Sequence, residues 1–349
     1  MFVSRYNTYL AVIDREIVQK FLCTYYEDDA PPAATEDDIE AAGFEVHRQV
    51  VTRVGFYRKG QGYLSARPDL SNGYSNVMQD RETFRLIDPS ILPPPVPEMP
   101  EEAHIAHKIH QIGIFPKEPG VYPEAFIENR NNIVALNQNY TFYFWSEGGY
   151  YDIEEFIQKH YGEEILKYYR AISPDYLAAR ADFFRYLCLY AIGGVYLDLK
   201  TAMSYPLDLV VRPEDRFLLS FWCHGARPHT EIEHIPYGEY EQYYIICAAG
   251  HPLMRRIIQQ VLCSIALYKR PIHGTGAYGI LRVTGPLLYS MIVHEYRDRY
   301  EDIVRQIHSF SNGIEYTIFD DNMAHHEHVG KDTHYSRRES NIINSEMLI

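Results

Sequence analysis

The chain has 349 residues, of which 46% are apolar, and a formal net charge of −14 at pH 7 from 47 acidic and 33 basic residues. This length and composition predict a folded protein with a substantial core, either one large domain with an appendage or two modest domains. The negative charge argues against nucleic acid or an anionic membrane as the main partner, because both bind concentrated positive charge.

Targeting signals and cysteines bear on the compartment. No run approaches the roughly 20 apolar residues that a membrane-spanning helix needs, and residues 1–26 lack the pattern of a signal peptide. The five cysteines are far apart and form no Cys-x-x-Cys pair, so we predict buried free thiols rather than zinc or redox sites. We therefore expect a cytoplasmic protein without a membrane span.

Residues 1–100 are predicted to form a small N-terminal module. An acidic stretch rich in alanine and proline, residues 27–42, precedes several short strand-like runs in residues 50–88. Residues 89–100 are rich in proline, which lacks an N–H donor and fixes its own backbone angle, so they read as a stiff connector that is neither helix nor central strand. The module shows no evident chemistry, and residues 101–349 form a second domain in this division.

Beyond the connector, strand and helix patterns alternate. The order is a strand at 107–114, a helix at 123–136, a strand at 140–145, a helical region at 153–172 interrupted near Gly162, and a helix whose first turn contains Pro174. Later elements are a strand at 217–222, helices at 252–268 and 286–296, and a strand at 314–319. This alternation predicts an α/β fold with parallel strands.

The helix that follows Pro174 contains a polar pair. Asp182 and Arg185 are three residues apart, a spacing at which they can pair with each other or present hydrogen-bonding groups to a polyol and a phosphate. The alternative is an ordinary surface ion pair. The pair lies on a different face from an apolar stripe at helical spacing, formed by Leu177, Ala181, Phe184, Cys188 and Ala191.

A further carboxylate follows this helix. Gly193 and Gly194 end the helix and residues 195–199 form a short buried strand, which places Asp198 near the carboxyl end of that strand. Open α/β sheets bind their ligands at this end. Asp198 could face a divalent metal that carries a diphosphate, or it could cap a helix or turn.

The combined pattern resembles the sugar-donor-binding region of glycosyltransferase family 32 and of the related large clostridial glucosylating toxins. The matching segment is Arg180-Ala181-Asp182-(x)2-Arg185-Tyr186-(x)3-Tyr190-(x)2-Gly193-Gly194-Val195-Tyr196-Leu197-Asp198. Weaker similarities at 108–112, 140–145, 250–252 and 284–286 extend the resemblance to about residues 104–340. It implies a GT-A fold, in which helices flank a mainly parallel central sheet.

The resemblance implies a hexosyltransferase that moves a sugar from a UDP- or GDP-sugar to a hydroxyl of a glycan, a lipid-linked sugar or a protein, with retention of configuration. The implied catalytic residues are Asp182, Arg185 and Asp198. The implied donor-binding residues are His110, Gln111, Arg180, Asp182, Arg185, Tyr186, Lys200 and Ser336. Asp198 and His334 would hold a divalent metal, Mn²⁺ or Mg²⁺.

Two departures from the family pattern leave alternatives open. Lys200 replaces the second aspartate of the family's Asp-x-Asp motif, and a protonated lysine cannot ligate a metal. Either His334 and other groups complete the metal site, or Lys200 neutralises the diphosphate itself, or the chain binds a donor without turnover. Gly113 stands where many relatives have a tryptophan near the base, so the identity of the base stays open.

A function of another class is a metal-dependent hydrolase. Its motivation is the histidine-rich segment 325–328, because histidine and carboxylate clusters bind zinc. The segment lacks the His-Glu-x-x-His spacing that places two ligands on one face of a helix. The sequence therefore favours the glycosyltransferase hypothesis.

Overall fold

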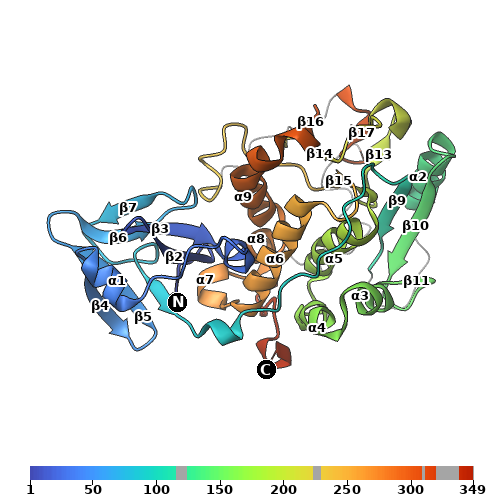
Figure 1. Cartoon of the computed structure of the whole chain (residues 1–349). Helices are drawn as coiled ribbons and strands as arrows, with labels where there is room; N and C mark the ends of the chain where they lie inside the picture. Colours follow the sequence, from blue (N-terminus) through green and yellow to red (C-terminus); the bar gives the residue numbers. More distant parts are fainter. Residues whose placement is uncertain (115–123, 223–228, 309–310, 320–337, 349) are drawn as a thin grey trace.

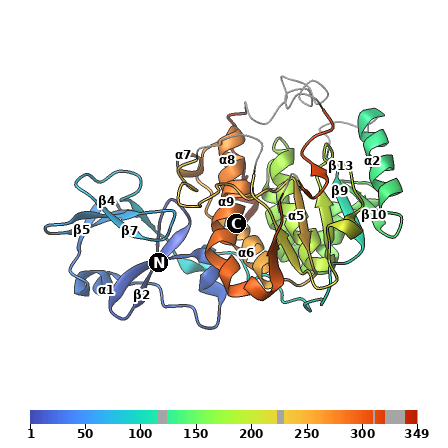
Figure 2. The ribbon, with the colours of Figure 1, turned by 90° about the horizontal axis from the view of Figure 1, so that it is seen from above.

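The computed structural model describes residues 1–114, 124–222, 229–308, 311–319 and 338–348. An antiparallel sheet formed by the N-terminal residues lies at one end of the molecule, and a second sheet lies at the other end (Figures 1 and 2). A group of helices separates the two sheets in both views. The predicted α/β class is confirmed.

The N-terminal sheet is antiparallel throughout, in the order β3-β2-β1-β8-β5-β6-β7, with β4 paired to β5. Its core contains aromatic residues, including Phe56 and Phe84, which pack with Ile39 of α1 (Glu36–Ala41). The strand-like runs predicted in residues 50–88 are confirmed. The strands are β1 (Phe2–Val3), β2 (Thr8–Ile13), β3 (Glu16–Phe21), β4 (Glu45–Val50), β5 (Arg53–Arg58), β6 (Gly62–Ala66), β7 (Asn72–Ser75) and β8 (Phe84–Leu86).

The proline-rich connector is packed against a helix. Its first residues form a 3₁₀ turn, η2 (Pro89–Ile91), so the prediction that no helix forms there is wrong: proline is tolerated in a first helical turn, which needs no N–H donor. Val96 is 1% exposed, and its N–H donates to Gln259 Oε1 of α6 (Pro252–Ala266) at 2.7 Å. Upstream, Asn7 Nδ2 donates to Ser264 Oγ of the same helix at 3.1 Å, and the Cys23 N–H donates to Gln260 Oε1 at 3.0 Å.

The second sheet has the strand order β11-β10-β9-β12-β15-β14-β16 among the described residues. The pairs β9–β10 and β9–β12 are parallel, and parallel pairing was predicted for β9 and β10. Strand β15 was not predicted, and it is antiparallel to both of its neighbours. The strands are β9 (Lys108–Ile112), β10 (Thr141–Ser146), β11 (Tyr151–Asp152), β12 (Gly194–Leu197), β14 (Phe217–Leu219), β15 (Tyr244–Cys247) and β16 (Val304–Gln306). The strand predicted at 314–319 is only β17 (Ile314–Glu315), which pairs with β13 (Ala202–Met203) outside this sheet.

The helices follow the predicted order with one boundary error. The break at Gly162 is confirmed, but Pro174 precedes the first turn of the next helix, because Tyr176 is the N-cap and the helix begins at Leu177. The α-helices not yet given are α2 (Glu124–Leu136), α3 (Ile153–Tyr161), α4 (Glu163–Ala171), α5 (Leu177–Ile192), α7 (Arg270–His273), α8 (Gly276–Val283) and α9 (Pro286–Tyr296). Further 3₁₀ helices are η1 (Leu22–Tyr26), η3 (Leu207–Leu209), η4 (Arg297–Ile303) and η7 (Ser345–Leu348).

Helix α5 is buried around most of its circumference, which differs from the single apolar stripe that was predicted. Leu177 and Ala181 of that stripe are only half-buried, whereas Asp182 and Arg185 are buried. The helix lies in the large core between the second sheet and α3, α6 and α9, and a smaller core on the other face of the sheet contains Ile133 of α2. Polar side chains on α5 are therefore enclosed by protein.

Two of the compositional predictions have direct outcomes. Four of the cysteines are free and buried, as predicted, and the fifth, Cys223, lies outside the described residues. In the part of the chain that the structure describes, no helix combines the length and the apolar character needed to cross a membrane.

The turn between α5 and β12 depends on glycine. Gly194 has φ +118°, and an added Cβ would lie 2.5 Å from the Lys108 carbonyl oxygen. We expect Gly194→Ala to lower the free energy of unfolding by about 2–4 kcal/mol, because it combines a left-handed backbone with a steric clash. Urea unfolding would measure this loss. The control is Gly148→Ala, where φ is +69° but no atom lies within 4 Å, and an equal loss there would contradict the steric argument.

Candidate functional site

Asp182, Arg185 and Asp198 meet at the carboxyl end of β12. Arg185 Nη2 donates to Asp182 Oδ1, and Arg185 Nη1 lies 3.5 Å from Asp198 Oδ1. The turn at Gly193 and Gly194 reverses the chain, so that four residues of strand run back along about two turns of α5. The side chains of Asp182 and Arg185 are each 7% exposed, whereas the side chain of Asp198 is 27% exposed.

Arg185 is the centre of this cluster. Its Nη1 also donates to the Gln242 carbonyl oxygen at 2.5 Å, and the guanidinium lies 4.6 Å from the centroid of the Tyr196 ring. Burial alone would lower its pKa, but Tyr196, Asp182 and Asp198 together raise the pKa of Arg185 above its usual value. Its Nε is buried without a hydrogen-bond partner among the described residues. The site therefore holds a permanent positive charge with a spare donor.

Asp182 is directed into the protein. Its Oδ2 accepts a hydrogen bond from Thr284 Oγ1 at 3.1 Å, while Oδ1 faces Arg185. Burial raises the pKa of Asp182 to about 6, against the opposing effect of the Arg185 charge and of the Thr284 hydroxyl. This enclosure rules out the alternative of an ordinary surface ion pair.

Asp198 is the most accessible of the three residues. The Tyr196 hydroxyl donates to its Oδ1 at 2.6 Å. Its backbone N–H donates to the Tyr243 carbonyl at 2.8 Å, and its carbonyl accepts from Gln111 Nε2 at 3.2 Å. Gln111, which was predicted to bind the donor, thus lies next to Asp198 and contacts its backbone in this structure.

The segment that follows Asp198 is held from two directions. Lys200 Nζ donates to the Tyr316 hydroxyl at 2.6 Å, and the same nitrogen lies 3.8 Å from the centroid of that ring. Asn129 of α2 donates through Nδ2 to the carbonyls of Leu199 and Thr201, at 3.2 and 2.8 Å. Asn129 and Tyr316 were not predicted, because an isolated asparagine or tyrosine far away in the sequence carries no periodic signal.

His110, a predicted donor-binding residue, lies inside the sheet and does not join the cluster. It accepts a hydrogen bond on Nδ1 from Trp145 Nε1 at 3.2 Å and donates through Nε2 to the Gly193 carbonyl at 2.9 Å. Burial lowers its pKa to about 4. In this structure both ring nitrogens support the strand and the glycine turn.

Arg180 and Tyr186, also predicted to bind the donor, contact other parts of the protein. Arg180 donates to the Ile172 carbonyl and forms an ion pair with Glu147 at 2.7 Å. Tyr186 donates through its hydroxyl to the Thr284 carbonyl at 2.9 Å, so it adjoins the residue that bonds Asp182. Tyr186 therefore contacts the residue that bonds Asp182, whereas Arg180 contacts Glu147 and the Ile172 carbonyl and not the cluster.

The described residues do not by themselves fit a divalent metal. They contain no group of three His, Cys, Asp or Glu side chains that could hold an ion. Asp182 is turned onto Arg185, and Lys200 stands where a second carboxylate would be needed. The predicted ligand His334, the predicted donor contact Ser336 and the histidine-rich segment 325–328 lie outside the described residues.

The comparison with protein families identifies this part of the chain. Residues 123–218 match the family model described as "Glycosyltransferase sugar-binding region containing DXD motif". This stretch of the chain is therefore similar to the sugar-binding region of glycosyltransferases. That region contains the Asp182, Arg185 and Asp198 cluster, and within it the sequence Asp198-Leu199-Lys200 departs from the Asp-x-Asp pattern that the description names.

Curated proteins similar to this chain are glycosyltransferases. The initiation-specific alpha-1,6-mannosyltransferase of Candida albicans is 25% identical over 192 residues, which cover 50% of this chain and 49% of that protein. Inositol phosphoceramide mannosyltransferase 3 of Schizosaccharomyces pombe is 25% identical over 175 residues, which cover 50% of this chain and 42% of that protein. The chain thus spans about half the length of the curated relatives that it matches.

Two solved structures with some similarity to this chain are also described as glycosyltransferases. The PaToxG glycosyltransferase has a TM-score of 0.40 and 17% identity, and the match covers 56% of this chain and 70% of that chain. The UDP-bound glycosyltransferase domain from the YGT toxin has a TM-score of 0.44 and 10% identity, with 62% of this chain and 82% of that chain covered.

Proposed function

We propose that this chain is a glycosyltransferase of the GT-A fold that binds a UDP- or GDP-sugar at the cluster of Asp182, Arg185 and Asp198. The observation that carries the proposal is the position of this cluster, at the carboxyl end of β12 and inside the matched sugar-binding region. Open α/β sheets take their ligands at that end of the strands. The buried pair of Asp182 and Arg185 holds the accessible carboxylate of Asp198. This carboxylate suits a polyol ligand, because its oxygens accept hydrogen bonds from hydroxyls.

The proposed roles follow from exposure and charge. Asp198 contacts the donor directly, since it is the accessible member of the cluster. Arg185 positions Asp198 and, with Lys200, supplies positive charge toward the leaving diphosphate. Asp182 acts as a positioning residue through its contact with Arg185.

The proposed reaction is a transfer with retention of configuration. The bond between the anomeric carbon and the phosphate oxygen breaks, and a new bond forms from the acceptor hydroxyl oxygen to that carbon on the same face. The departing phosphate oxygen takes the acceptor proton. Mn²⁺ or Mg²⁺, if used, would need ligands beyond those that the described residues provide.

The names of the relatives guide the choice of sugar and acceptor. Both are named as mannosyltransferases, so a mannosyl group is the first sugar to test. One is named for inositol phosphoceramide, so lipid-linked acceptors stand beside glycans and protein hydroxyls in our proposal. The cytoplasmic location stays a prediction.

A panel of UDP- and GDP-sugars, with and without Mn²⁺, tests the proposal. A donor at 100 times its dissociation constant should stabilise the purified protein by about 2.7 kcal/mol, measured by thermal unfolding. Release of the nucleotide diphosphate, measured with glycan and lipid acceptors, then separates transfer from binding. A stability shift without release under any condition would favour the alternative of a binding protein without turnover, and no shift with any donor would contradict the donor site.

The variant Lys200→Asp restores the Asp-x-Asp pattern. We expect donor affinity in this variant to depend more strongly on Mn²⁺ than in the wild type, because a second carboxylate can ligate the ion. Lys200→Ala serves as the control, since it removes the ammonium without adding a ligand, and it should weaken donor binding about tenfold whether or not Mn²⁺ is present. Titrations of donor at several Mn²⁺ concentrations measure both effects, and an identical metal response in the two variants would contradict the assignment.

A further inference from the structure

Two arginines face each other across the N-terminal sheet. The antiparallel register of β5 and β8 places Arg53 directly opposite Arg85. The next pair in register, Val54 and Phe84, is fully buried in the core, so the alternation of side chains sends both arginines to the opposite face. Like charges directly opposite each other destabilise a sheet, and this pair therefore calls for compensation.

The hydrogen bonds of Arg85 explain its position in the protein, whereas no ion pair with a described carboxylate explains the position of Arg53. Arg85 donates to the Leu267 carbonyl at the end of α6 at 2.9 Å and to Asn7 Oδ1 at 3.2 Å. Burial, followed by the charge of Arg53, lowers its pKa to about 10, and its Nε is buried with no partner among the described residues. Arg53 is exposed and forms no ion pair with any described carboxylate.

These two side chains line a small cavity where the N-terminal module meets α7. Its other lining residues are Arg5, Asp80, Thr83 and Ile272. Asp80 lies 3.6 Å from Arg5, but its side chain is 73% exposed, so one solvated carboxylate faces three guanidinium groups. The local charge is thus positive in a chain whose net charge is −14.

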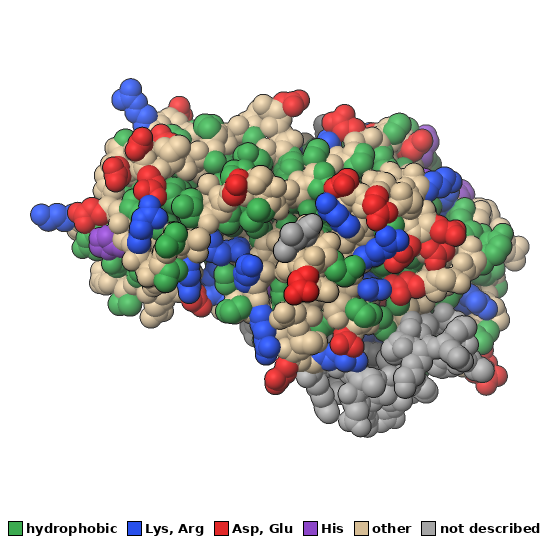
Figure 3. Space-filling view, turned by 90° about the horizontal axis from the view of Figure 1, so that it is seen from below, with side chains coloured by type: hydrophobic (Ala, Val, Ile, Leu, Met, Phe, Trp, Pro, Cys, Tyr) green, Lys and Arg blue, Asp and Glu red, His purple; other side chains and the backbone are tan. Residues whose placement is uncertain are grey.

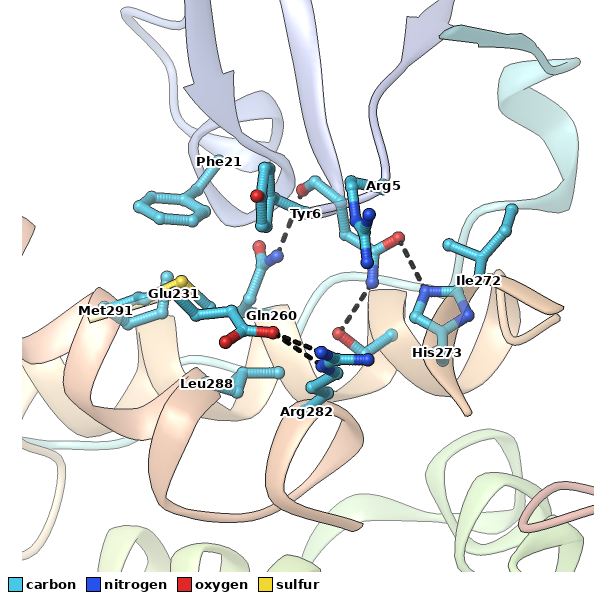
Figure 4. A pocket seen from close by; sticks show the side chains of 13 residues that line it. Arg5, Tyr6, Phe21, Glu231, Gln260, Ile272, His273, Arg282, Leu288 and Met291 are labelled. Atoms are coloured by element: carbon cyan, nitrogen blue, oxygen red, sulfur yellow. Dashed lines mark hydrogen bonds and ion pairs between the residues drawn. The ribbon is translucent and has the colours of Figure 1, made fainter. Parts of the chain in front are cut away.

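Two neighbouring hollows adjoin this cavity and add one arginine and one carboxylate each. A cavity that shares Arg5 and Ile272 adds Arg282, which is paired with Glu231, and Figure 4 shows Arg5 and Arg282 directed into it from the N-terminal module and from α8. On the other side, an open hollow shares Arg5, Arg53 and Asp80 and adds Arg81 and Glu82. This hollow gives access from solvent. Figure 3 shows lysine and arginine side chains gathered on the face of the molecule where the N-terminal module joins the helices.

We propose that a phosphate group binds at the mouth of this junction cavity, which is lined by Arg5, Arg53 and Arg85 and opens into the hollow that shares Arg5 and Arg53. Guanidinium groups match the oxygens of a phosphate in geometry and charge, and the anion would remove the repulsion between the cross-strand arginines. The phosphate is either free inorganic phosphate or the phosphoryl group of a sugar phosphate, because both present the same oxygens. The inference is independent of the proposed transferase activity, since it uses no residue of the Asp198 cluster.

Binding of inorganic phosphate and of glucose 6-phosphate to the full chain tests this site. Calorimetric titration at constant ionic strength should show saturable binding by the wild type. Arg53→Ala should weaken binding at least tenfold, whereas Lys59→Ala, which removes an exposed charge of the same module, should change it less than twofold. Without phosphate, Arg53→Ala should melt at or above the wild-type temperature, because the variant relieves the repulsion.

The outcomes separate the two sources and can overturn the proposal. Much tighter binding of inorganic phosphate would identify free phosphate as the ligand, and much tighter binding of glucose 6-phosphate would identify a sugar phosphate. Equal affinities would show that the site contacts the phosphate oxygens alone. Saturable binding that Arg53→Ala leaves unchanged would place the anion elsewhere, for example at Arg185, and would overturn the inference. Absence of saturable binding of either probe by the folded wild type would overturn it as well.

Discussion

Asp198→Ala is expected to reduce sugar transfer about 10²–10³-fold, while the protein stays folded. The side chain is the accessible carboxylate of the cluster, and its removal takes away the proposed contact with the donor and the partner of Arg185 Nη1. Loss of one preorganised polar group in an active site commonly costs about 10²–10³ in rate. The measurement is the steady-state release of nucleotide diphosphate, with the donor that stabilises the wild type.

A matched variant makes the test specific. Asp208 is an exposed carboxylate of the same sugar-binding region and accepts hydrogen bonds from Asn139 Nδ2. Asp208→Ala should therefore keep near wild-type turnover. Thermal unfolding of both variants should lie close to that of the wild type, since each residue is at least partly exposed. Undiminished turnover in Asp198→Ala would sink the site assignment.

Arg185→Met is expected to lower the free energy of unfolding by about 3–5 kcal/mol at pH 8, because it leaves Asp182 as a buried carboxylate without a cation. The pKa of Asp182 is already raised to about 6, and removal of the arginine raises it further. A carboxyl group with a raised pKa in the folded state favours folding at low pH and loses that contribution as pH rises through the folded pKa. The loss should therefore be smaller at pH 5 than at pH 8.

A double variant separates the charge effect from loss of packing. Asp182→Asn combined with Arg185→Met removes both charges and should recover much of the stability lost in Arg185→Met alone. Arg180→Met is the matched single control, because Arg180 lies on the same helix but pairs with the exposed Glu147, and it should cost less. Guanidinium unfolding of the wild type, Asp182→Asn, Arg185→Met and the double variant gives the four free energies of the cycle at each pH, and strictly additive losses would contradict the coupling.

Much of the fold could be predicted because it rests on long periodic segments. Helix α9 begins and ends where the apolar pattern placed it, and β9 and β10 pair in parallel as the alternation with α2 indicated. Strand β15 was missed: its four residues lie in a run of aromatic and aliphatic side chains too short to show a period, and its antiparallel direction depends on the whole sheet.

The meeting of Asp182, Arg185 and Asp198 could be predicted, but not their surroundings. Their spacing around a glycine turn brings a helix face and a strand end together, which is local information. The enclosure of Asp182 depends on Thr284, which is 102 residues away in the chain. His110 was assigned to the donor because its strand resembles the first strand of the family, and only packing reveals that the Gly193 carbonyl and Trp145 occupy both of its ring nitrogens.

Helix α6 makes hydrogen bonds with both the N-terminal module and the connector, and these bonds hold the two ends of the molecule together. On α6, three polar side chains bond the backbone or side chains of Val96, Cys23 and Asn7; they are Gln259, Gln260 and Ser264. A hinge motion at this junction would therefore leave buried donors and acceptors without partners. The same helix packs against α5, which carries Asp182 and Arg185. The two sheets should therefore melt in a single cooperative transition, and a ligand that tightens the junction would also slow local opening around the sugar-binding region.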